Sequence, residues 1–274
     1  MKVIDFHTHV FPDKIAARTI EALLSELDDD SKAYTDGTLE GLKKSMKESA
    51  ADYSVVLPVV TKVSQFESVN KYAAEINGKD NIISFGGIHP ENDNIEEKLD
   101  YIKSLGLKGI KLHPDYQKTF IDDERYIKII SYCVKIGLIV SIHAGVDIGL
   151  PDVVHCTPYR AEKMIEAVCG SIKTTETAKI VLAHIGGYDL YDEVEQLLVG
   201  APVYFDLSYG LDKIDETRLL RIIRNHGADK VLFATDSPWA GQAEFIEKMN
   251  SLPLTNEEKE LIMYKNAEKL LGIN

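Results

Sequence analysis

Eight short runs of apolar and β-branched residues recur along the 274-residue chain, and most are followed by a segment with helical periodicity. The runs cover residues 2–6, 54–60, 81–86, 107–112, 138–142, 179–183, 203–207 and 230–234. Continuous apolar strands are typical of a parallel sheet covered on both faces, and their alternation with helices indicates βα units. The pattern predicts a (β/α)8 TIM barrel, with an open doubly wound sheet as the rival. No linker or repeat interrupts residues 1–274, so we expect a single domain.

Helices are expected between and after these runs. They cover residues 13–27, 39–51, 66–77, 95–104, 124–135, 159–169, 190–198, 215–226, 244–249 and 256–271. The last has a clear start, because Thr255 followed by Glu258 matches a capping box. Two connections are longer than the rest. Residues 28–38 contain the acidic run Asp28 to Asp30, interpreted as a solvated turn, and residues 144–158 would lie on the catalytic face of a barrel.

The composition argues against several classes of protein. The 31 Lys and Arg residues against 44 Asp and Glu residues give a formal charge of −13, which disfavours a nucleic-acid partner. No apolar run approaches the ~20 residues that cross a bilayer, and Asp5, His7 and His9 interrupt any signal-peptide core. We therefore expect a cytoplasmic protein without membrane contact. The three cysteines lack CxxC spacing and are interpreted as packing residues.

Six of the eight histidines lie at or just past the carboxyl end of an expected strand, and one aspartate does the same. They are His7, His9, His89, His113, His143, His184 and Asp236. The carboxyl ends of barrel strands converge on one mouth, so residues distant in sequence become neighbours there. Of the other two histidines, His226 is far from any strand end. It lies inside an amphipathic helix and is expected to be structural or on the surface.

The spacing of His7 and His9 points both rings to the same face of the first strand. Two histidines on an exposed strand would give the same pattern, but this strand is otherwise apolar and would bury them. Together with His143, His184 and Asp236 they form a set of nitrogen and carboxylate donors that suits a divalent transition ion, with Zn²⁺ as the first candidate. Each of these residues alone has a structural explanation, and Asp236 could simply cap a helix.

Several segments together resemble the amidohydrolase superfamily, and in particular its amidohydrolase-related group, which also contains metal-dependent decarboxylases. They are residues 4–9 (IDFHTH), 109–114 (GIKLHP), 140–143 (VSIH), 181–187 (VLAHIGG), 232–239 (LFATDSPW) and 266–272 (NAEKLLG). The resemblance implies that His7, His9 and His143 bind the metal. It also implies that His184 lies beside the metal and that Asp236 is both ligand and proton acceptor.

Residues 87–90 (GIHP) are similar to a segment of the TatD-like hydrolases, a related group of metal-dependent barrels. TatD-like enzymes place a metal-bridging glutamate on the fourth strand, where this chain has Lys111 and His113. Some amidohydrolases use a carboxylated lysine as the bridge, so Lys111 could take that role. We favour one metal ion.

The expected activity is hydrolysis of an amide, lactone or ester in a small organic substrate, with Asp236 and His184 as catalytic residues. Two alternatives stay open, namely a metal-dependent decarboxylase and a barrel that has lost catalysis. An anionic substrate would need cationic partners near the strand ends. The candidates are His89, Lys111, His113, His155 and Arg160. Three aromatic residues, Tyr116, Tyr188 and Trp239, could wall the pocket. The oligomeric state is open, and a homo-oligomer is compatible with the sequence.

Overall fold

The computed structural model describes residues 1–27, 31–174 and 176–273. The acidic run Asp28 to Asp30 therefore lies outside the described residues. The strands are β1 (Ile4–Thr8), β2 (Tyr53–Val56), β3 (Ile82–Ser84), β4 (Gly86–Gly87), β5 (Gly109–Leu112), β6 (Ile139–Ile142), β7 (Ile180–Leu182), β8 (Tyr204–Asp206) and β9 (Val231–Leu232). Each of the eight predicted runs contains strand, and the third is divided into β3 and β4 around Phe85.

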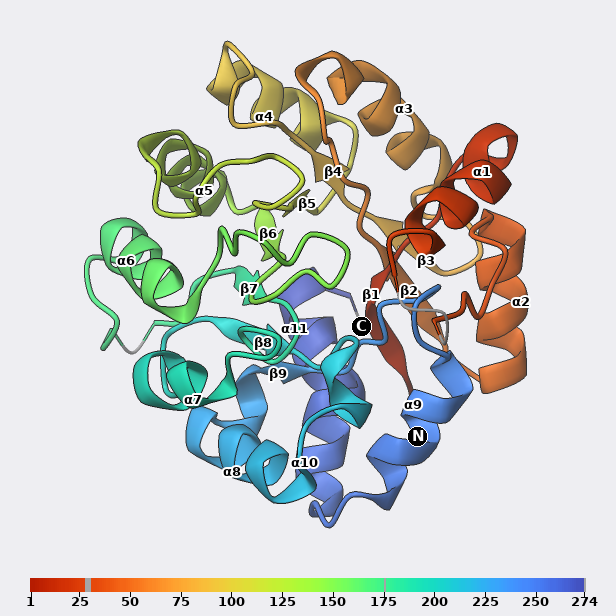
Figure 1. The fold of residues 1–274 in the computed structure, drawn as a ribbon, viewed down its shortest axis with the longest axis vertical. Coiled ribbons are helices and arrows are strands. Elements are labelled where there is room, and N and C mark those ends of the chain that lie inside the picture. Colours follow the sequence, from red (N-terminus) through yellow and green to blue (C-terminus); the bar gives the residue numbers. More distant parts are fainter. Residues whose placement is uncertain (28–30, 175, 274) are drawn as a thin grey trace.

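The strands form one closed ring. All their pairings are parallel, from β1 through β3 and from β4 through β9. The two ends of the ring meet where Phe6 N donates to Phe233 O at 2.9 Å and where Thr8 bridges to Ser237. Figure 1 shows the strands at the centre with helices around them. The predicted (β/α)8 barrel is confirmed, and the open sheet is excluded.

Helices cover the outside of the ring. They are α1 (Asp13–Leu24), α2 (Leu39–Ser49), α3 (Phe66–Ile76), α4 (Ile95–Ser104), α5 (Glu124–Ile136), α6 (Pro158–Cys169), α7 (Tyr191–Glu193), α8 (Glu216–His226), α9 (Gln242–Ser251), α10 (Asn256–Glu260) and α11 (Asn266–Leu271). A π-helical turn, Leu261–Lys265, joins α10 to α11, so the predicted last helix is present with one wide turn inside it. Its capping box is confirmed, because Thr255 Oγ1 accepts from Glu258 N and Glu258 Oε2 accepts from Thr255 N.

Two apolar layers hold the barrel together. Side chains such as Val181 and Tyr204 belong to an inner cluster that includes residues of α11, whereas their neighbours along the strands pack under the outer helices. On β5, Ile110 and Leu112 belong to the outer layer, so strand alternation turns the intervening Lys111 toward the barrel interior. The same alternation places Asp206 on the side of Tyr204. The ends of these strands therefore present polar side chains to the mouth.

Candidate metal centre

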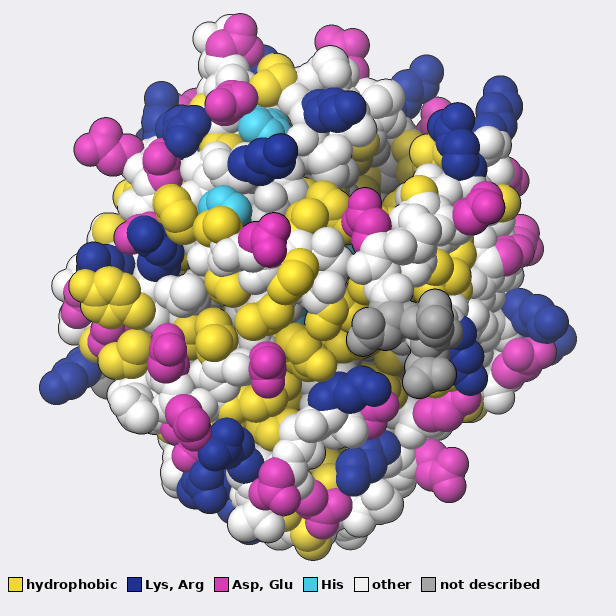
Figure 2. Space-filling view, viewed as in Figure 1, with side chains coloured by type: hydrophobic (Ala, Val, Ile, Leu, Met, Phe, Trp, Pro, Cys, Tyr) yellow, Lys and Arg dark blue, Asp and Glu magenta, His cyan; other side chains and the backbone are white. Residues whose placement is uncertain are grey.

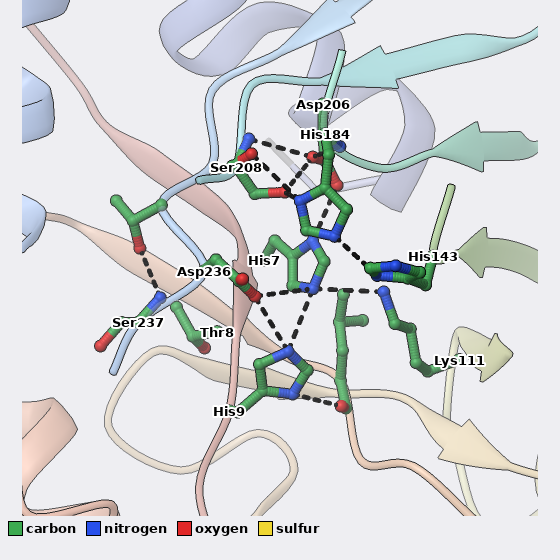
Figure 3. Close-up of polar contacts among 12 residues, drawn as sticks. His7, Thr8, His9, Lys111, His143, His184, Asp206, Ser208, Asp236 and Ser237 are labelled. Carbon is green, nitrogen blue, oxygen red and sulfur yellow. Dashed lines mark hydrogen bonds and ion pairs between the residues drawn. The ribbon is translucent and has the colours of Figure 1, made fainter. Parts of the chain in front are cut away.

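Three side chains converge at the carboxyl ends of the first and last strands, and we call them the converging triad: His7, His9 and Asp236 (Figure 3). The Nε2 atoms of His7 and His9 lie 3.1 Å apart. Asp236 Oδ1 is 3.2 Å from His7 Nε2 and 3.1 Å from His9 Nε2. The predicted shared face of His7 and His9 is present, and the ring closure between β1 and residues 233–237 brings Asp236 to it.

The hydrogen bonds behind the triad fix which nitrogens carry protons. His9 Nδ1 donates to the Leu57 carbonyl oxygen at 2.8 Å, and His7 Nδ1 donates to Asp206 Oδ2 at 3.0 Å. Burial and the neighbouring Lys111 charge lower the pKa of His7 to about 3, so its ring is neutral near pH 7. Nε2 of the neutral His7 ring therefore carries a lone pair, and Nε2 of His9 faces the same point beside the carboxylate of Asp236.

This arrangement fits a divalent cation. Two imidazole nitrogens and a carboxylate oxygen face each other, and positive charge placed among them stabilises such a cluster. Ligand atoms held tetrahedrally at about 2.0–2.1 Å from an ion are separated by about 3.3 Å, close to the three distances of the triad. Lys111 Nζ lies 3.2 Å from His7 Nε2. Burial is the main cause that lowers the pKa of this lysine, to about 8.

The other two predicted ligands are not part of the triad. His143 lies instead with His113 and Asp147 in what we call the stacked cluster. The rings of His113 and His143 are nearly parallel, 12° apart with centroids separated by 4.1 Å, and His113 Nε2 is 3.3 Å from Asp147 Oδ2. His143 Nδ1 lies 3.0 Å from His184 Nε2, which places His184 between the two clusters.

Asp206 is a site residue that the sequence analysis missed. Its Oδ2 holds His7, while its Oδ1 accepts from His184 N at 3.0 Å and from the Ser208 hydroxyl. Although burial opposes ionisation, the hydrogen bond from His7 and the nearby Lys111 charge lower the pKa of Asp206 overall. The signal in the sequence was an aspartate inside the apolar run 203–207 rather than just past its end.

Three of the predicted substrate contacts lie away from the cavity that contains the triad and have other partners. His155 Nδ1 is 3.0 Å from Asp115 Oδ1, and Arg160 donates to Asp122 at 2.7 Å. His89 accepts from the backbone amide two residues further on. None of the three lines that cavity. A position near a strand end predicts that a residue lies near the mouth of the barrel. The conformation of the following loop determines where its side chain points.

The cavity at the mouth has a volume of about 650 Å³. The triad, Lys111, His113, His143 and His184 line its inner end, and the predicted aromatic residues Tyr116, Tyr188 and Trp239 also line it. The predicted catalytic-side connection contributes residues 146–149. Lys111 and His113 are thus the two predicted substrate contacts that the structure places within reach of a ligand.

The fold and the site together define a class of protein: parallel (β/α)8 barrels with clustered histidines and carboxylates at the carboxyl ends of their strands. The chain belongs to the Amidohydrolase family, whose model matches residues 4–273. This confirms the resemblance stated from the motifs. A search of curated proteins found no match. Within the described residues, no helix is long and apolar enough to cross a membrane.

Solved structures with the same fold include two decarboxylases. A 2,6-dihydroxybenzoate decarboxylase bound to 2,6-dihydroxybenzoate is 14% identical over 100% of both chains, with a TM-score of 0.76. A 5-carboxyvanillate decarboxylase from Novosphingobium aromaticivorans, in complex with manganese and 4-hydroxy-3-methoxy-5-nitrobenzoic acid, is 15% identical over 99% of this chain and 96% of its own, with a TM-score of 0.70. An uncharacterized TIM-barrel protein from Bordetella bronchiseptica is 20% identical over 99% of each chain, with a TM-score of 0.78. Identities this low show a shared fold.

Proposed function

We propose that the protein is a metal-dependent hydrolase of an amide, lactone or ester bond in a small organic substrate. The observation that carries the proposal is the converging triad, in which the Asp236 carboxylate contacts the histidines through one of its two oxygens. Asp236 contacts both histidines through Oδ1, and its Oδ2 accepts no hydrogen bond from any described residue. One oxygen can therefore hold an ion while the other accepts a proton.

His7, His9 and Asp236 would hold the ion, and Zn²⁺ is our first candidate because imidazole and carboxylate donors suit it. A divalent ion at this point supplies positive charge that polarises a carbonyl oxygen. Asp236 Oδ2 accepts the proton of the attacking water and returns it to the leaving atom. The Lys111 ammonium group, buried beside His7, adds a second positive charge near the oxygen that becomes negative.

His184 is the second catalytic residue in this proposal. Its ring centroid is 5.3 Å from that of His7, and its Nδ1 donates to the Ser208 carbonyl oxygen at 3.1 Å. The atom left to exchange a proton is therefore Nε2, which faces His143 Nδ1. In this proposal a proton passes between His184 Nε2 and His143 Nδ1, which lie 3.0 Å apart between the triad and the stacked cluster.

Non-oxidative decarboxylation of a small carboxylic acid is the second candidate. The cavity favours it because most residues that line its outer part are apolar, and an apolar surrounding destabilises a substrate carboxylate relative to neutral carbon dioxide. Two of the structures with the same fold are also named as decarboxylases. Decarboxylation needs a proton donor to carbon, whereas the bare carboxylate oxygen of Asp236 suits the acceptor that hydrolysis needs.

Isotope incorporation separates the two activities. The metal-loaded protein is incubated in H2¹⁸O with a panel of lactones, esters and amides and, separately, with aromatic and unsaturated carboxylic acids. We expect one ¹⁸O atom in the carboxylic acid that hydrolysis releases and none in the alcohol or amine. Asp236→Asn should keep its fold while turnover falls by about 10²- to 10⁴-fold. Release of carbon dioxide together with an organic product that contains no ¹⁸O would refute the hydrolase and support the decarboxylase. Full turnover by Asp236→Asn would remove its proton-transfer role.

A further inference from the structure

Helix α1 carries two apolar faces, and packing of the barrel accounts for only one. Ala16 and Ile20 are buried. Ile15 and Leu23, eight positions apart and therefore on one face, line the cavity instead. Ile15 is 37% exposed, although solvent-facing helix positions are ordinarily polar. Apolar side chains that line a pocket are typical of a ligand-binding wall.

Other elements add apolar side chains to the wall of the same cavity. Val69 and Tyr72 of α3 line it, as does Ile148 of the 144–158 connection, which is 38% exposed. We call these five residues, Ile15, Leu23, Val69, Tyr72 and Ile148, the apolar arm. In Figure 2, hydrophobic side chains gather across the middle of the face shown. The arm is continuous with the metal centre, because both line the same cavity of about 650 Å³.

The charges in the outer part of the cavity are mainly negative. Apart from the histidines, the triad and Lys111 at the inner end, its charged lining residues among those described are Lys14, Glu26 and Asp147. Gly149 lies between the two acids, because a Cβ built on it would be 3.4 Å from Asp147 Oδ1 and 3.7 Å from Glu26 Oε2. Two carboxylates near one exposed lysine disfavour a second anionic group at this end of a ligand.

We propose that the apolar arm binds an uncharged, unbranched hydrocarbon tail of the substrate while the polar head lies at the converging triad. The inference rests on the proposed function for the reaction at the inner end, and it adds the substrate class. Each methylene buried in the arm raises affinity about fourfold, so tail length dominates the choice of substrate. A dicarboxylate of equal length would carry its second charge toward Glu26 and Asp147.

Trp239 provides a direct readout, because it is the single tryptophan of the chain and it lines the same cavity. The metal-loaded protein is titrated with butanoate, hexanoate, octanoate and octanedioate while tryptophan fluorescence is recorded. We expect affinity to rise about 16-fold for each added pair of methylenes. Octanedioate should bind more weakly than octanoate, and Glu26→Gln should narrow that difference. Equal affinities along the series would overturn the proposal.

A matched pair of variants tests whether the arm is responsible. Ile15→Asn alters the arm, and Val134→Asn alters a valine of α5 that is 38% exposed and lies outside the cavity lining. Ile15→Asn should lower octanoate affinity about tenfold with little effect on butanoate, and Val134→Asn should change neither. Equal losses in the two variants would overturn the assignment. The titration needs no turnover, so binding that depends on chain length supports the arm by itself. Absence of hydrolysis of any ester, lactone or amide would refute the proposed function but not the arm.

Discussion

Two clusters at the barrel mouth contain the same residue types, two histidines and one aspartate, and differ in geometry. In the converging triad, the rings of His7 and His9 meet at 69° with their Nε2 atoms 3.1 Å apart. In the stacked cluster, His113 and His143 lie face to face at 12°. An imidazole lone pair lies in the plane of its ring. The lone pairs therefore meet at one point in the triad and run side by side in the stacked cluster.

The partners behind the rings differ as well. Both triad histidines donate their Nδ1 protons to protein oxygens, which fixes the tautomer that a metal requires. His143 has no such oxygen partner: its Nδ1 faces His184, and its Nε2 is buried with no hydrogen-bond partner among the described residues. Residue types at a strand end are thus not enough to define a metal site. We propose that convergence of the ligand atoms and an oriented tautomer make the triad, rather than the stacked cluster, the site that would hold the ion.

The largest expected effect comes from removing one ring from each cluster. His9→Ala should reduce bound divalent metal to a small fraction of one equivalent and abolish turnover, because the triad loses one of its three donors. His113→Ala should retain the metal, since its ring is not directed at the triad. Elemental analysis after dialysis, with circular dichroism as a check of folding, measures both. Equal metal loss in the two variants would show that the clusters act as one site.

A smaller effect is expected from the carboxylates behind the two clusters. Asp206→Asn leaves the ligands in place but weakens the orientation of His7, so metal affinity should fall by roughly 10- to 100-fold. Asp115→Asn is the matched change, because Asp115 Oδ2 is 3.8 Å from His143 Nε2, too far for a hydrogen bond. It should leave metal affinity unchanged. Competition with a chelator measures the metal affinity of both variants. A comparable loss of affinity in Asp115→Asn would contradict the different roles assigned to Asp206 and Asp115.

Most of the fold could be predicted because its signals are local. The apolar runs predicted the strands, and His7 with His9 at alternate positions of a strand predicted a shared face. The division of the third strand at Phe85 was not predicted, since the apolar run continues through it. Closure of the ring between β1 and residues 233–237 depends on contacts far apart in sequence, and it is this closure that brings Asp236 to the histidines.

The site was predicted less completely because depth in the barrel does not fix the direction of a side chain. His113 and His143 end adjacent strands as expected, yet they stack on each other rather than joining the triad. His155 and Arg160 follow strand ends but form ion pairs with nearby aspartates. Asp206 escaped notice because it lies within an apolar run. These outcomes depend on loop conformation and on pairing between strands.

His226, a buried histidine outside both clusters, can be compared with the histidines of the triad and of the stacked cluster. His226 lies at the end of α8 and stacks on Phe205, with ring centroids 3.8 Å apart. Its Nε2 donates to the Val203 carbonyl oxygen at 3.0 Å, and its Nδ1 accepts from Gly200 N at 3.2 Å. Both nitrogens thus have protein partners, so this ring needs no cation. The interpretation of His226 as a structural residue agrees with this environment.

The smallest expected effect on the metal centre is therefore that of His226→Gln, which should leave metal binding unchanged and alter only the acid dependence of stability. Burial, reinforced by the charge of Lys230, lowers the pKa of His226 from 6.5 to about 3. Between these values the unfolded chain binds a proton that the folded chain does not, so stability falls as the pH falls. From pH 7 to 5 the wild type should lose about 2 kcal/mol more than His226→Gln in urea unfolding. Saturating metal should not change this difference, because helix ends that lead into strands lie on the face of the barrel opposite the mouth. If the free energy of unfolding fell equally for the two proteins between pH 7 and 5, His226 would already be protonated in the folded state.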